Sequence, residues 1–321
     1  MDSSTLLRIA GQRIPRLGRT LLASTKGATN RGFLAVGATA TSQLQGEWWS
    51  RSIVRNTLKF RAARQPNFLR QPDFLSVQQH YSHTLPRHQM AAPAGQDAVQ
   101  WKLMNEDECI LVNESDEVLG HDSKLNCHLW EKIQTGKVLH RAFSVFLFNT
   151  KNELLLQQRS ATKVTFPLVW TNTCCSHPLF RESELVEADN LGVRNAAQRK
   201  LKDEVGIEAG DAPVDGFTVL GRILYKAPSN DQWGEHEVDY VLFAKRDVKV
   251  EPNPEEVAAV QYVTQDQLRE LVAKADSKEG GIVLSPWFRL IVDKFLYKWW
   301  DLLEADKLSE AIDLQTIHKL S

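Results

Sequence analysis

The sequence is poor in cysteine, with only Cys109, Cys127, Cys174 and Cys175 among its 321 residues. So few thiols argue against the disulfide framework that stabilises small secreted domains. Two of the four are adjacent in the sequence, and adjacent cysteines form a strained bridge. We therefore expect the cysteines to be reduced thiols.

Long apolar runs are also missing, and the sequence shows no internal repeat. The longest apolar piece of the N-terminal part is residues 33–38. A helix that spans a membrane needs roughly 20 apolar residues, so this piece is far too short. We therefore expect no membrane span.

Acidic residues are scarce at the N-terminal end. Residues 1–95 contain three Asp and Glu against 13 Lys and Arg, of totals of 40 and 39, so 37 acidic and 26 basic residues remain for the rest. A composition rich in Arg, Ser, Thr and Ala and poor in acids is typical of organelle transit peptides. We expect residues 1–95 to be such a transit peptide, the alternative being a disordered tail without a targeting role. The composition alone fits plastid and mitochondrion, and a start at Met90 or Met104 would favour cytosol or peroxisome.

Residues 96–321 carry the acidic excess, and we expect them to form one folded domain. They contain no basic patch large enough to bind nucleic acid by releasing counterions from phosphates. Nucleic acid is therefore not an expected partner. The Trp299–Trp300 segment is interpreted as a docked helix or as an oligomer contact, so we expect a monomer or a weak dimer.

Apolar patterning after residue 100 predicts strands interspersed with three helices. The predicted strands are 108–113, 118–120, 143–149, 153–159, 217–226 and 237–245. The predicted helices are 190–205 with Gly206 as its stop, 264–275 with a capping box, and one that begins at Ser285–Pro286 and runs past Trp300. Residues 121–140 are interpreted as a short helix and a loop. This order predicts an α/β (mixed α+β) domain with a mixed sheet and helices on its faces.

Two short stretches carry residues suited to chemistry. Cys175 and His177 are two residues apart, so in an extended backbone both side chains point to the same face. Glu235 and Glu237 have the same spacing in a predicted strand. A thiol, an imidazole and paired carboxylates can form a metal site combined with acid–base chemistry at carbon. The plain alternatives are a buried cysteine, an ordinary core histidine and a solvated strand face.

Five motifs in order resemble the type I isopentenyl-diphosphate isomerase family, whose members have the Nudix fold. They are His140–Ser144, Gln157–Ser160, Thr171–His177, Trp233–Glu237 and Ser285–Trp287. The resemblance covers about residues 97–303 and is close to the plant members, which favours a plastid location. It implies a Nudix-type α/β/α sandwich with extra C-terminal helices. It also implies a 1,3-allylic proton shift that converts isopentenyl diphosphate into dimethylallyl diphosphate, a small-molecule reaction that supplies isoprenoid precursors.

The resemblance assigns roles to four residues at the reacting carbons. Cys175, rather than Cys174, matches the catalytic thiol because it lies two residues before His177. It and Glu237 would exchange protons with the olefin from opposite faces, with Tyr225 hydrogen-bonded near the carboxylate. Trp287 would face the carbocation that forms, with Trp170 as a second candidate, because an indole face stabilises a buried cation.

The resemblance also implies a metal site and a diphosphate site. The metal ligands would be His128, His140, His177, Glu235 and Glu237, holding Mg²⁺ or instead Zn²⁺ or Mn²⁺. The diphosphate contacts would be Lys124, Arg159, Lys163, Ser176 and Lys200. A second Mg²⁺ bridging the diphosphate would draw on Glu204.

One segment departs from the pattern of Nudix hydrolases, R-E-U-x-E-E-x-G-U with U a bulky aliphatic residue, in which the Glu residues hold catalytic metals. The segment 199–207 has Lys200 in place of the first Glu and Asp203 as the next acid. A cation in place of a metal-binding carboxylate disfavours hydrolysis of a diphosphate and favours holding it intact. A Nudix diphosphohydrolase is therefore the second interpretation, and a metal-dependent binding or redox-sensing module that uses Cys174–Cys175 is the third.

Overall fold

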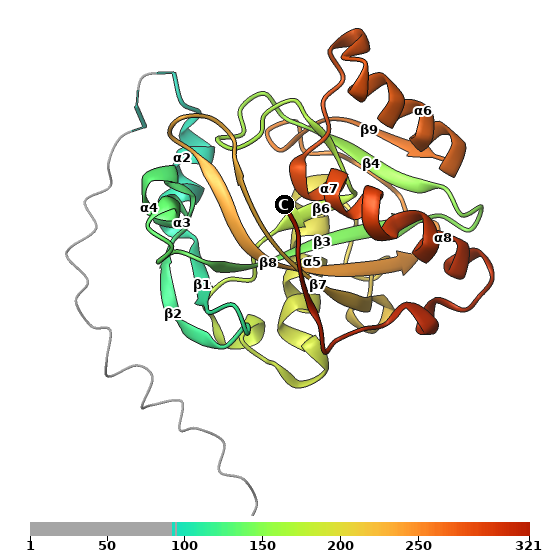
Figure 1. The fold of residues 1–321 in the computed structure, drawn as a ribbon, viewed down its shortest axis with the longest axis horizontal. Coiled ribbons are helices and arrows are strands. Elements are labelled where there is room, and N and C mark those ends of the chain that lie inside the picture. Colours follow the sequence, from blue (N-terminus) through green and yellow to red (C-terminus); the bar gives the residue numbers. More distant parts are fainter. Residues whose placement is uncertain (1–91, 94) are drawn as a thin grey trace, which may run out of the picture. The chain divides into compact units, whose positions relative to one another are not determined.

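The computed structural model describes residues 92–93 and 95–321 (Figure 1). The predictions made for residues 1–95, a transit peptide or a disordered tail, therefore fall almost entirely outside the described residues. From Ala98 onward, helices and strands are interspersed along the chain, and this order confirms the predicted α/β class. No helix among the described residues is long and apolar enough to cross a membrane.

A ten-stranded mixed sheet forms the centre of the described part. Six strands lie in the order β10-β7-β8-β3-β1-β2, while β4 and β6 pair with β3, and β5 and β9 pair with β4. β3 pairs with β8 in parallel, as β10 does with β7, and the other pairings are antiparallel. The strands are β1 (Glu108–Val112), β2 (Val118–Ser123), β3 (His140–Phe148), β4 (Leu154–Arg159), β5 (Trp170–Thr171), β6 (Cys174–Ser176), β7 (Thr218–Pro228), β8 (Gly234–Lys245), β9 (Val257–Val263) and β10 (Ile317–Lys319).

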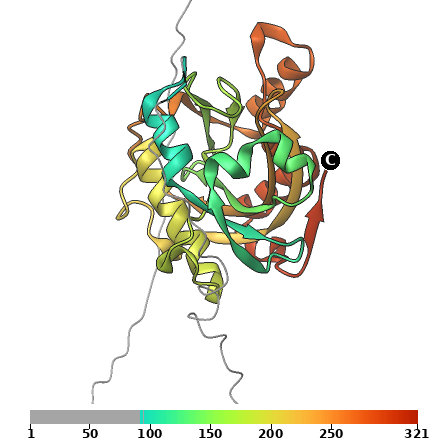
Figure 2. The same ribbon diagram turned by 90° about the vertical axis from the view of Figure 1, so that its left-hand side faces the viewer.

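Helices cover both faces of this sheet (Figures 1 and 2). The α-helices are α2 (Ala98–Glu106), α3 (Lys124–His128), α4 (Trp130–Gln134), α5 (Leu191–Val205), α6 (Gln265–Asp276), α7 (Pro286–Ile291) and α8 (Tyr297–Glu304). A π-helical stretch, Val292–Leu296, joins α7 to α8. Short 3₁₀ turns are Glu182–Glu184, Ala188–Asn190, Val214–Gly216, Glu279–Gly281 and Leu308–Ala311.

Strand β3 shows why the molecule has three layers, because both of its faces are buried. Phe146 and Phe148 pack into a core shared with α6, α7 and α8, whereas Val145 and Leu147 pack into a second core with α5. Alternation of side chains along a strand sends neighbouring residues to opposite faces. A continuous apolar strand therefore requires helices on both sides, and the predicted α/β/α sandwich is confirmed.

The helix ends follow the signals in the sequence. Gly206 ends α5 with a φ of 66°, and its N–H donates to the carbonyl of Leu201. A glycine adopts this left-handed conformation without steric cost, so it is favoured at a helix stop. Thr264 and Gln267 form the predicted capping box at the start of α6. Both helices thus begin and end close to the predicted residues.

Several elements differ from the prediction. β3 begins at His140 rather than residue 143, because its first residues are buried by pairing with β1 and β8. The helix α2 and the strands β9 and β10 were not predicted, because their sequences are short and only weakly periodic. The last predicted helix is interrupted by the π-helical stretch Val292–Leu296. These differences matter for the site, since β3 and α2 both contribute to it.

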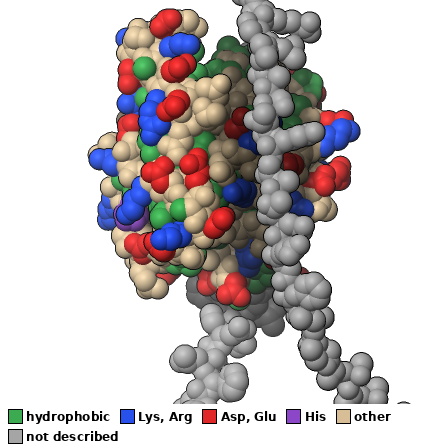
Figure 3. Space-filling model, turned by 90° about the vertical axis from the view of Figure 1, so that its right-hand side faces the viewer, with side chains coloured by type: hydrophobic (Ala, Val, Ile, Leu, Met, Phe, Trp, Pro, Cys, Tyr) green, Lys and Arg blue, Asp and Glu red, His purple; other side chains and the backbone are tan. Residues whose placement is uncertain are grey.

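The surface drawn in Figure 3 carries acidic and basic side chains interspersed with one another. Exposed ion pairs such as Lys249–Glu251 and Arg269–Asp266 belong to this mixed charge pattern. Such exposed pairs contribute little to stability. The buried pair Lys163–Glu256 bears on the site, because Lys163 lines a cavity that is described below.

Candidate active site

The register of the sheet brings the predicted residues together around β3. On one edge of β3, His140 lies opposite Glu237 of β8. On its other edge, Ser144 lies opposite Cys175 of β6. Tyr225 of β7 in turn lies opposite Glu237. The thiol and the carboxylate therefore flank the same strand, although 62 residues separate them in the sequence.

Three histidines and one glutamate converge beside β3. Ligand atoms of His128, His140, His177 and Glu237 all lie within 4.8 Å of one another, and all four residues are buried. Nε2 of His140 and Nε2 of His177 lie 3.1 and 2.9 Å from the same carboxylate atom, Oε1 of Glu237. Nδ1–H of His128 donates to the carbonyl of Lys124 at 2.7 Å, which leaves its Nε2 as an acceptor.

The chemistry of this cluster fits a divalent metal ion. Burial lowers the pKa of His177 to about 3, although hydrogen bonding to Glu237 opposes the shift. Burial also lowers the pKa of His128 well below its ordinary value, and the nearby imidazoles add to the shift. Both rings are therefore neutral at neutral pH, and neutral imidazole is the form that binds a metal. Three imidazole nitrogens and a carboxylate oxygen form an N₃O donor set.

Glu235 stands beside this cluster rather than in it. Its carboxyl contacts the Tyr225 hydroxyl at 2.8 Å and the Thr165 hydroxyl at 3.3 Å. The same Tyr225 hydroxyl lies 2.6 Å from Oε2 of Glu237. Burial, together with the charge of Glu237, raises the pKa of Glu235 to about 7. One hydroxyl has one proton to donate, so the two carboxyl groups share the Tyr225 hydroxyl as a donor.

A cavity opens next to the cluster, with about 500 Å³ of empty space that is partly open to solvent. Cys175 and Glu237 both line it, together with Tyr225 and Trp287. The other predicted residues in its wall are Lys124, His128, Arg159, Lys163, Ser176, His177 and Glu235. Residues of widely separated motifs thus share one cavity.

The two adjacent cysteines differ in surroundings. Cys174 is fully buried, and its Sγ lies 3.4 Å from Oε2 of Glu204 on the α5 side of the sheet. Cys175 lines the cavity, with its Sγ 3.6 Å from Nη1 of Arg159. Burial raises the pKa of Cys175 to about 12, although the positive charge of Arg159 opposes the shift. The thiol of Cys175 is therefore protonated at neutral pH.

Two basic side chains in the wall are held by buried partners. The Arg159 guanidinium donates to the carbonyls of Thr165 and Phe166 at 2.8 and 2.9 Å, and it lies 5.6 Å from the Trp287 ring centroid. Nζ of Lys163 donates to Oε2 of Glu256 at 2.5 Å. Both cations therefore face the cavity from fixed positions.

Lys200 and Glu204 do not reach the cavity wall. Nζ of Lys200 lies 3.3 Å from Oε1 of Glu204, one helical turn along α5. Oε2 of Glu204 accepts from Nε2 of Gln157 at 3.0 Å. These two residues are therefore paired with each other, and the charge of Lys200 also acts on Glu256, the partner of Lys163. Trp170, the second candidate for the cation-facing indole, is likewise not among the residues that line the cavity.

Several residues of the site were missed by the sequence analysis. Gln100 and Met104 of α2, Ser144 and Thr165 all line the cavity. Glu256, which holds Lys163, precedes a strand that was not predicted. The only signal for α2 is its N-cap, where the Asp97 side chain accepts from two backbone N–H groups. No signal in the sequence distinguishes Glu256 from the neighbouring Glu255, because both belong to an acidic loop.

The fold and the family match define the class of the protein. Residues 138–287 match the NUDIX domain family. Enzymes of this class use divalent metals, which agrees with the His/Glu cluster. The chain is thus a protein of the Nudix fold, with the mixed sheet and flanking helices described above.

Curated relatives narrow this class to one family. The chain is 70% identical over 230 residues to "Isopentenyl-diphosphate Delta-isomerase II" of Clarkia breweri, covering 72% of this chain and 80% of the relative. It is 70% identical over 227 residues to "Isopentenyl-diphosphate Delta-isomerase II, chloroplastic" of Arabidopsis thaliana, covering 71% and 80%. It is 69% identical over 230 residues to "Isopentenyl-diphosphate Delta-isomerase I" of Camptotheca acuminata, covering 72% and 98%. The chain therefore belongs to the isopentenyl-diphosphate Delta-isomerase family.

Proposed function

We propose that this chain converts isopentenyl diphosphate into dimethylallyl diphosphate by protonation at C4 and deprotonation at C2 of the olefin, with Cys175 and Glu237 as the proton-transferring groups. Close relatives that carry the isomerase name support the reaction. The observation that carries the residue assignment is the shared cavity, in which Cys175 and Glu237 flank β3 from opposite edges. A five-carbon unit between them would be accessible to a proton donor on one side and an acceptor on the other.

Proton transfer needs a hydrogen-bond network next to the carboxylate. The Tyr225 hydroxyl contacts both Glu235 and Glu237, so it connects the two carboxyl groups of β8. Burial raises the pKa of Tyr225 well above its ordinary value, so the phenol keeps its proton at neutral pH. We assign Tyr225 the role of holding the Glu237 carboxylate and stabilising either of its protonation states.

Protonation of the olefin places positive charge on its tertiary carbon. The Trp287 indole is buried in the cavity wall, and its Nε1–H donates to Oδ1 of Asn172 at 3.0 Å. This hydrogen bond fixes the orientation of the ring, and we propose that the indole stabilises the cation through its face. The apolar side chains of Phe143 and Met104 also line the cavity and would keep water from capturing the cation as an alcohol.

We propose that His128, His140, His177 and Glu237 hold one Mg²⁺ ion, with Zn²⁺ or Mn²⁺ as alternatives suited to the imidazole-rich donor set. When bound, the ion would supply positive charge beside Glu237 and restrict which carboxylate oxygen carries a proton. Glu235 is proposed as a further ligand that would have to turn from Tyr225 and Thr165. A second Mg²⁺ would accompany the diphosphate, and Glu204 would have to turn from Lys200 and Gln157 to serve as its carboxylate ligand.

The diphosphate head requires cations and donors. We propose Lys124, Arg159, Lys163 and Ser176, all of which line the cavity, as its contacts. Lys200 was predicted as a further contact, but it would have to leave its pairing with Glu204 to reach the diphosphate. In the segment that corresponds to the hydrolase pattern, Lys200 and Glu204 thus pair with each other. This pairing agrees with retention rather than cleavage of the diphosphate.

The reaction is tested by incubating the protein with isopentenyl diphosphate and Mg²⁺ while following products and released phosphate separately. We expect dimethylallyl diphosphate to appear without phosphate release. Release of phosphate without an allylic product would favour a Nudix diphosphohydrolase instead. A Cys175→Ser variant that keeps full turnover would favour a redox-sensing role for the cysteine pair.

For the location, we propose that residues 1–95 direct the protein to the plastid and that residues 96–321 are the catalytic domain. A relative from Arabidopsis thaliana is named chloroplastic, and the stretch of this chain that matches the Camptotheca acuminata relative covers 98% of that protein. A fluorescent protein fused to residues 1–95 should enter plastids, and its retention in the cytosol would contradict the proposal. We further propose a monomer or weak dimer, which sedimentation velocity would test.

A further inference from the structure

A buried carboxylate beside the cavity has no role in the mechanism proposed above. Glu256 is 5% exposed, and both of its carboxylate oxygens are engaged. Oε2 accepts from Nζ of Lys163 at 2.5 Å, and Oε1 accepts from Nε2 of Gln100 at 3.0 Å. Lys163 and Gln100 both line the cavity, whereas Glu256 does not. Glu256 therefore contacts the cavity wall only through other side chains.

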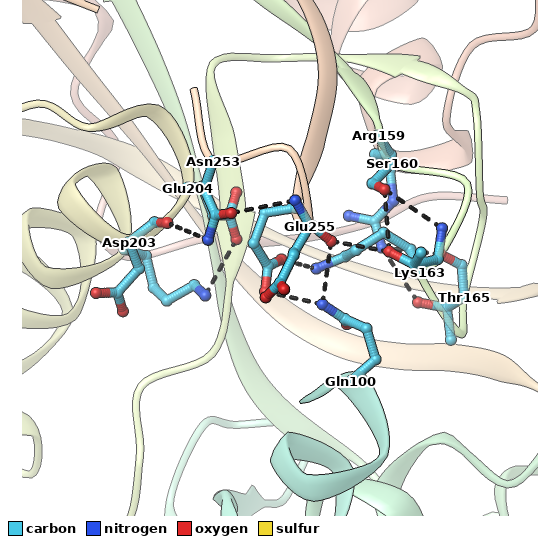
Figure 4. Close-up of polar contacts among 12 residues, drawn as sticks. Gln100, Arg159, Ser160, Lys163, Thr165, Asp203, Glu204, Asn253 and Glu255 are labelled. Carbon is cyan, nitrogen blue, oxygen red and sulfur yellow. Dashed lines mark hydrogen bonds and ion pairs between the residues drawn. The ribbon is translucent and has the colours of Figure 1, made fainter. Parts of the chain in front are cut away.

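The backbone of the turn that Asn253 and Glu255 belong to is fixed from two further directions (Figure 4). In this turn, the carbonyl of Glu256 accepts from the N–H of Ser160, three residues before Lys163. Asn253 starts the same turn, and its N–H donates to the carbonyl of Glu204 at the end of α5. The loop 253–256 thus joins α5, the loop that carries Lys163, and α2, through Gln100. A carboxylate on such a loop can hold a flexible side chain in one place.

The flexible side chain of Lys163 needs a fixed carboxylate partner more than the side chain of Arg159 does. The Arg159 guanidinium is fixed by two backbone carbonyls, while Lys163 has a flexible four-carbon stem and a compact charge. Its ammonium group has three N–H donors, of which Glu256 takes one and leaves two for a diphosphate oxygen. Burial raises the pKa of Glu256, but the charges of Lys163 and Lys200 outweigh burial and hold it below its ordinary value. The partner of Lys163 is therefore an ionised carboxylate.

We propose that Glu256 is a positioning residue for the diphosphate subsite: it holds the Lys163 ammonium at the cavity wall, with Gln100 fixing its second oxygen. This inference rests on the proposed function, because it takes the diphosphate head as the ligand of Lys163. A simple charge argument gives the opposite expectation, since removal of a negative charge should favour an anion. The two effects have opposite signs, so one substitution decides between them.

The test compares Glu256→Gln with Glu255→Gln in the full chain. Both variants remove one negative charge from adjacent positions. The Glu255 side chain is exposed and has no hydrogen bond or ion pair among the described residues, so this variant reports the charge effect alone. In Glu256→Gln the amide would leave Lys163 without its carboxylate. We expect KM for isopentenyl diphosphate to rise about tenfold or more, as for other charge-assisted hydrogen bonds, while kcat changes less than about threefold.

Inorganic pyrophosphate provides a second readout that needs no turnover. It carries the diphosphate charge without the olefin, so its dissociation constant, measured by calorimetry, should rise by the same factor in Glu256→Gln. Glu255→Gln should leave the dissociation constant within about twofold, or lower it slightly, as expected for a screened surface charge. Equal or tighter binding by Glu256→Gln would overturn the proposal.

Lys163→Met shows whether Glu256 acts through Lys163. Once Lys163 is gone, adding Glu256→Gln should change pyrophosphate affinity less than about twofold, since coupled residues are not additive. Additive effects would contradict a positioning role. Should Glu256→Gln fail to fold in a thermal melt, Glu256→Asp serves instead, with the charge kept and the reach shortened, and we expect an intermediate loss. A wild-type protein that binds pyrophosphate but forms no dimethylallyl diphosphate would refute the function and leave the positioning of Lys163 standing.

Discussion

The two adjacent cysteines each have a lysine–glutamate pair nearby, yet only Cys175 lines the cavity of the candidate site. On the α5 face, Cys174 lies against Glu204, which pairs with Lys200. On the opposite face, Cys175 lines the cavity near Lys163, which pairs with Glu256. Side-chain alternation along β6 separates the two thiols. The comparison teaches that residue types alone do not define a site, because the same types on the α5 face form core contacts.

The largest contrast is expected between the two cysteines. Cys175→Ser should lower kcat on the order of 10²–10⁴-fold, because it removes a proton-transferring group from the cavity. Cys174→Ser is the matched control, and its kcat should stay within about threefold, since its thiol faces the core. The rate of dimethylallyl diphosphate formation measures both. Similar losses of kcat in the two variants would contradict the functional difference between the two cysteines.

The metal cluster gives the next contrast. His140→Ala removes a buried imidazole of the cluster and should lower bound metal and activity by about 10–100-fold, as ligand and supporting groups do in other metal sites. His121→Ala is the control, because that ring stacks on Phe180 outside the cluster. Metal content by mass spectrometry, together with re-addition of Mg²⁺, Mn²⁺ or Zn²⁺ after chelation, measures the effect. Unchanged metal content in His140→Ala would contradict the proposal that this cluster binds the metal.

The two lysines should separate binding from stability. Lys163→Met should raise KM about tenfold or more, because it removes a cation from the cavity wall. Lys200→Met should act mainly on stability, by about 3–5 kcal/mol, because it leaves the buried Glu204 carboxylate without its cation. KM and the urea midpoint of each variant test this. A large rise in KM with unchanged stability for Lys200→Met would show that Lys200 reaches the diphosphate.

The smallest effect concerns pH and the α5 face. Burial raises the pKa of Glu184, but hydrogen bonds and charge from Arg199 outweigh burial and hold the pKa below its ordinary value. A depressed pKa stabilises the folded state above the unfolded value near 4.5 and loses that contribution as pH falls through the folded value. Glu184→Gln should therefore destabilise the protein at pH 7 and show a weaker loss of stability below about pH 4.5. Parallel pH profiles of wild type and variant would contradict this.

The sequence predicted most strands of the sheet. It also predicted the two stretches of the site that lie far apart in the chain, one with Cys175 and one with Glu237. Strong apolar runs predicted β3 and β4, and the capping box predicted α6, because these signals are local. The resemblance to the isomerase family indicated Cys175, Tyr225, Glu237 and Trp287, which the structure brings into one cavity. That convergence depends on strand register, which only the folded sheet defines.

Other features were beyond the sequence for physical reasons. Gln100 contributes to the cavity from a short helix that is stabilised by tertiary contacts rather than by its own periodicity. Glu256 is one of two adjacent glutamates, and only the fold decides that one is buried and the other exposed. Lys200 and Glu204 were predicted at the diphosphate, and this stays a prediction, since the structure shows only that they pair with each other and do not line the cavity. Sequence spacing indicates which residues share a helix face, but not what lies opposite that face.

Proton NMR of isopentenyl diphosphate incubated with the protein in D₂O tests the central claim most directly. Our account predicts migration of the double bond together with deuterium entry into the methyl group formed from C4 and loss of a proton from C2. Both changes should vanish in Cys175→Ser and persist in Cys174→Ser. Double-bond migration without deuterium entry, or equal turnover in the two variants, would contradict proton transfer by groups that flank β3 in a common cavity.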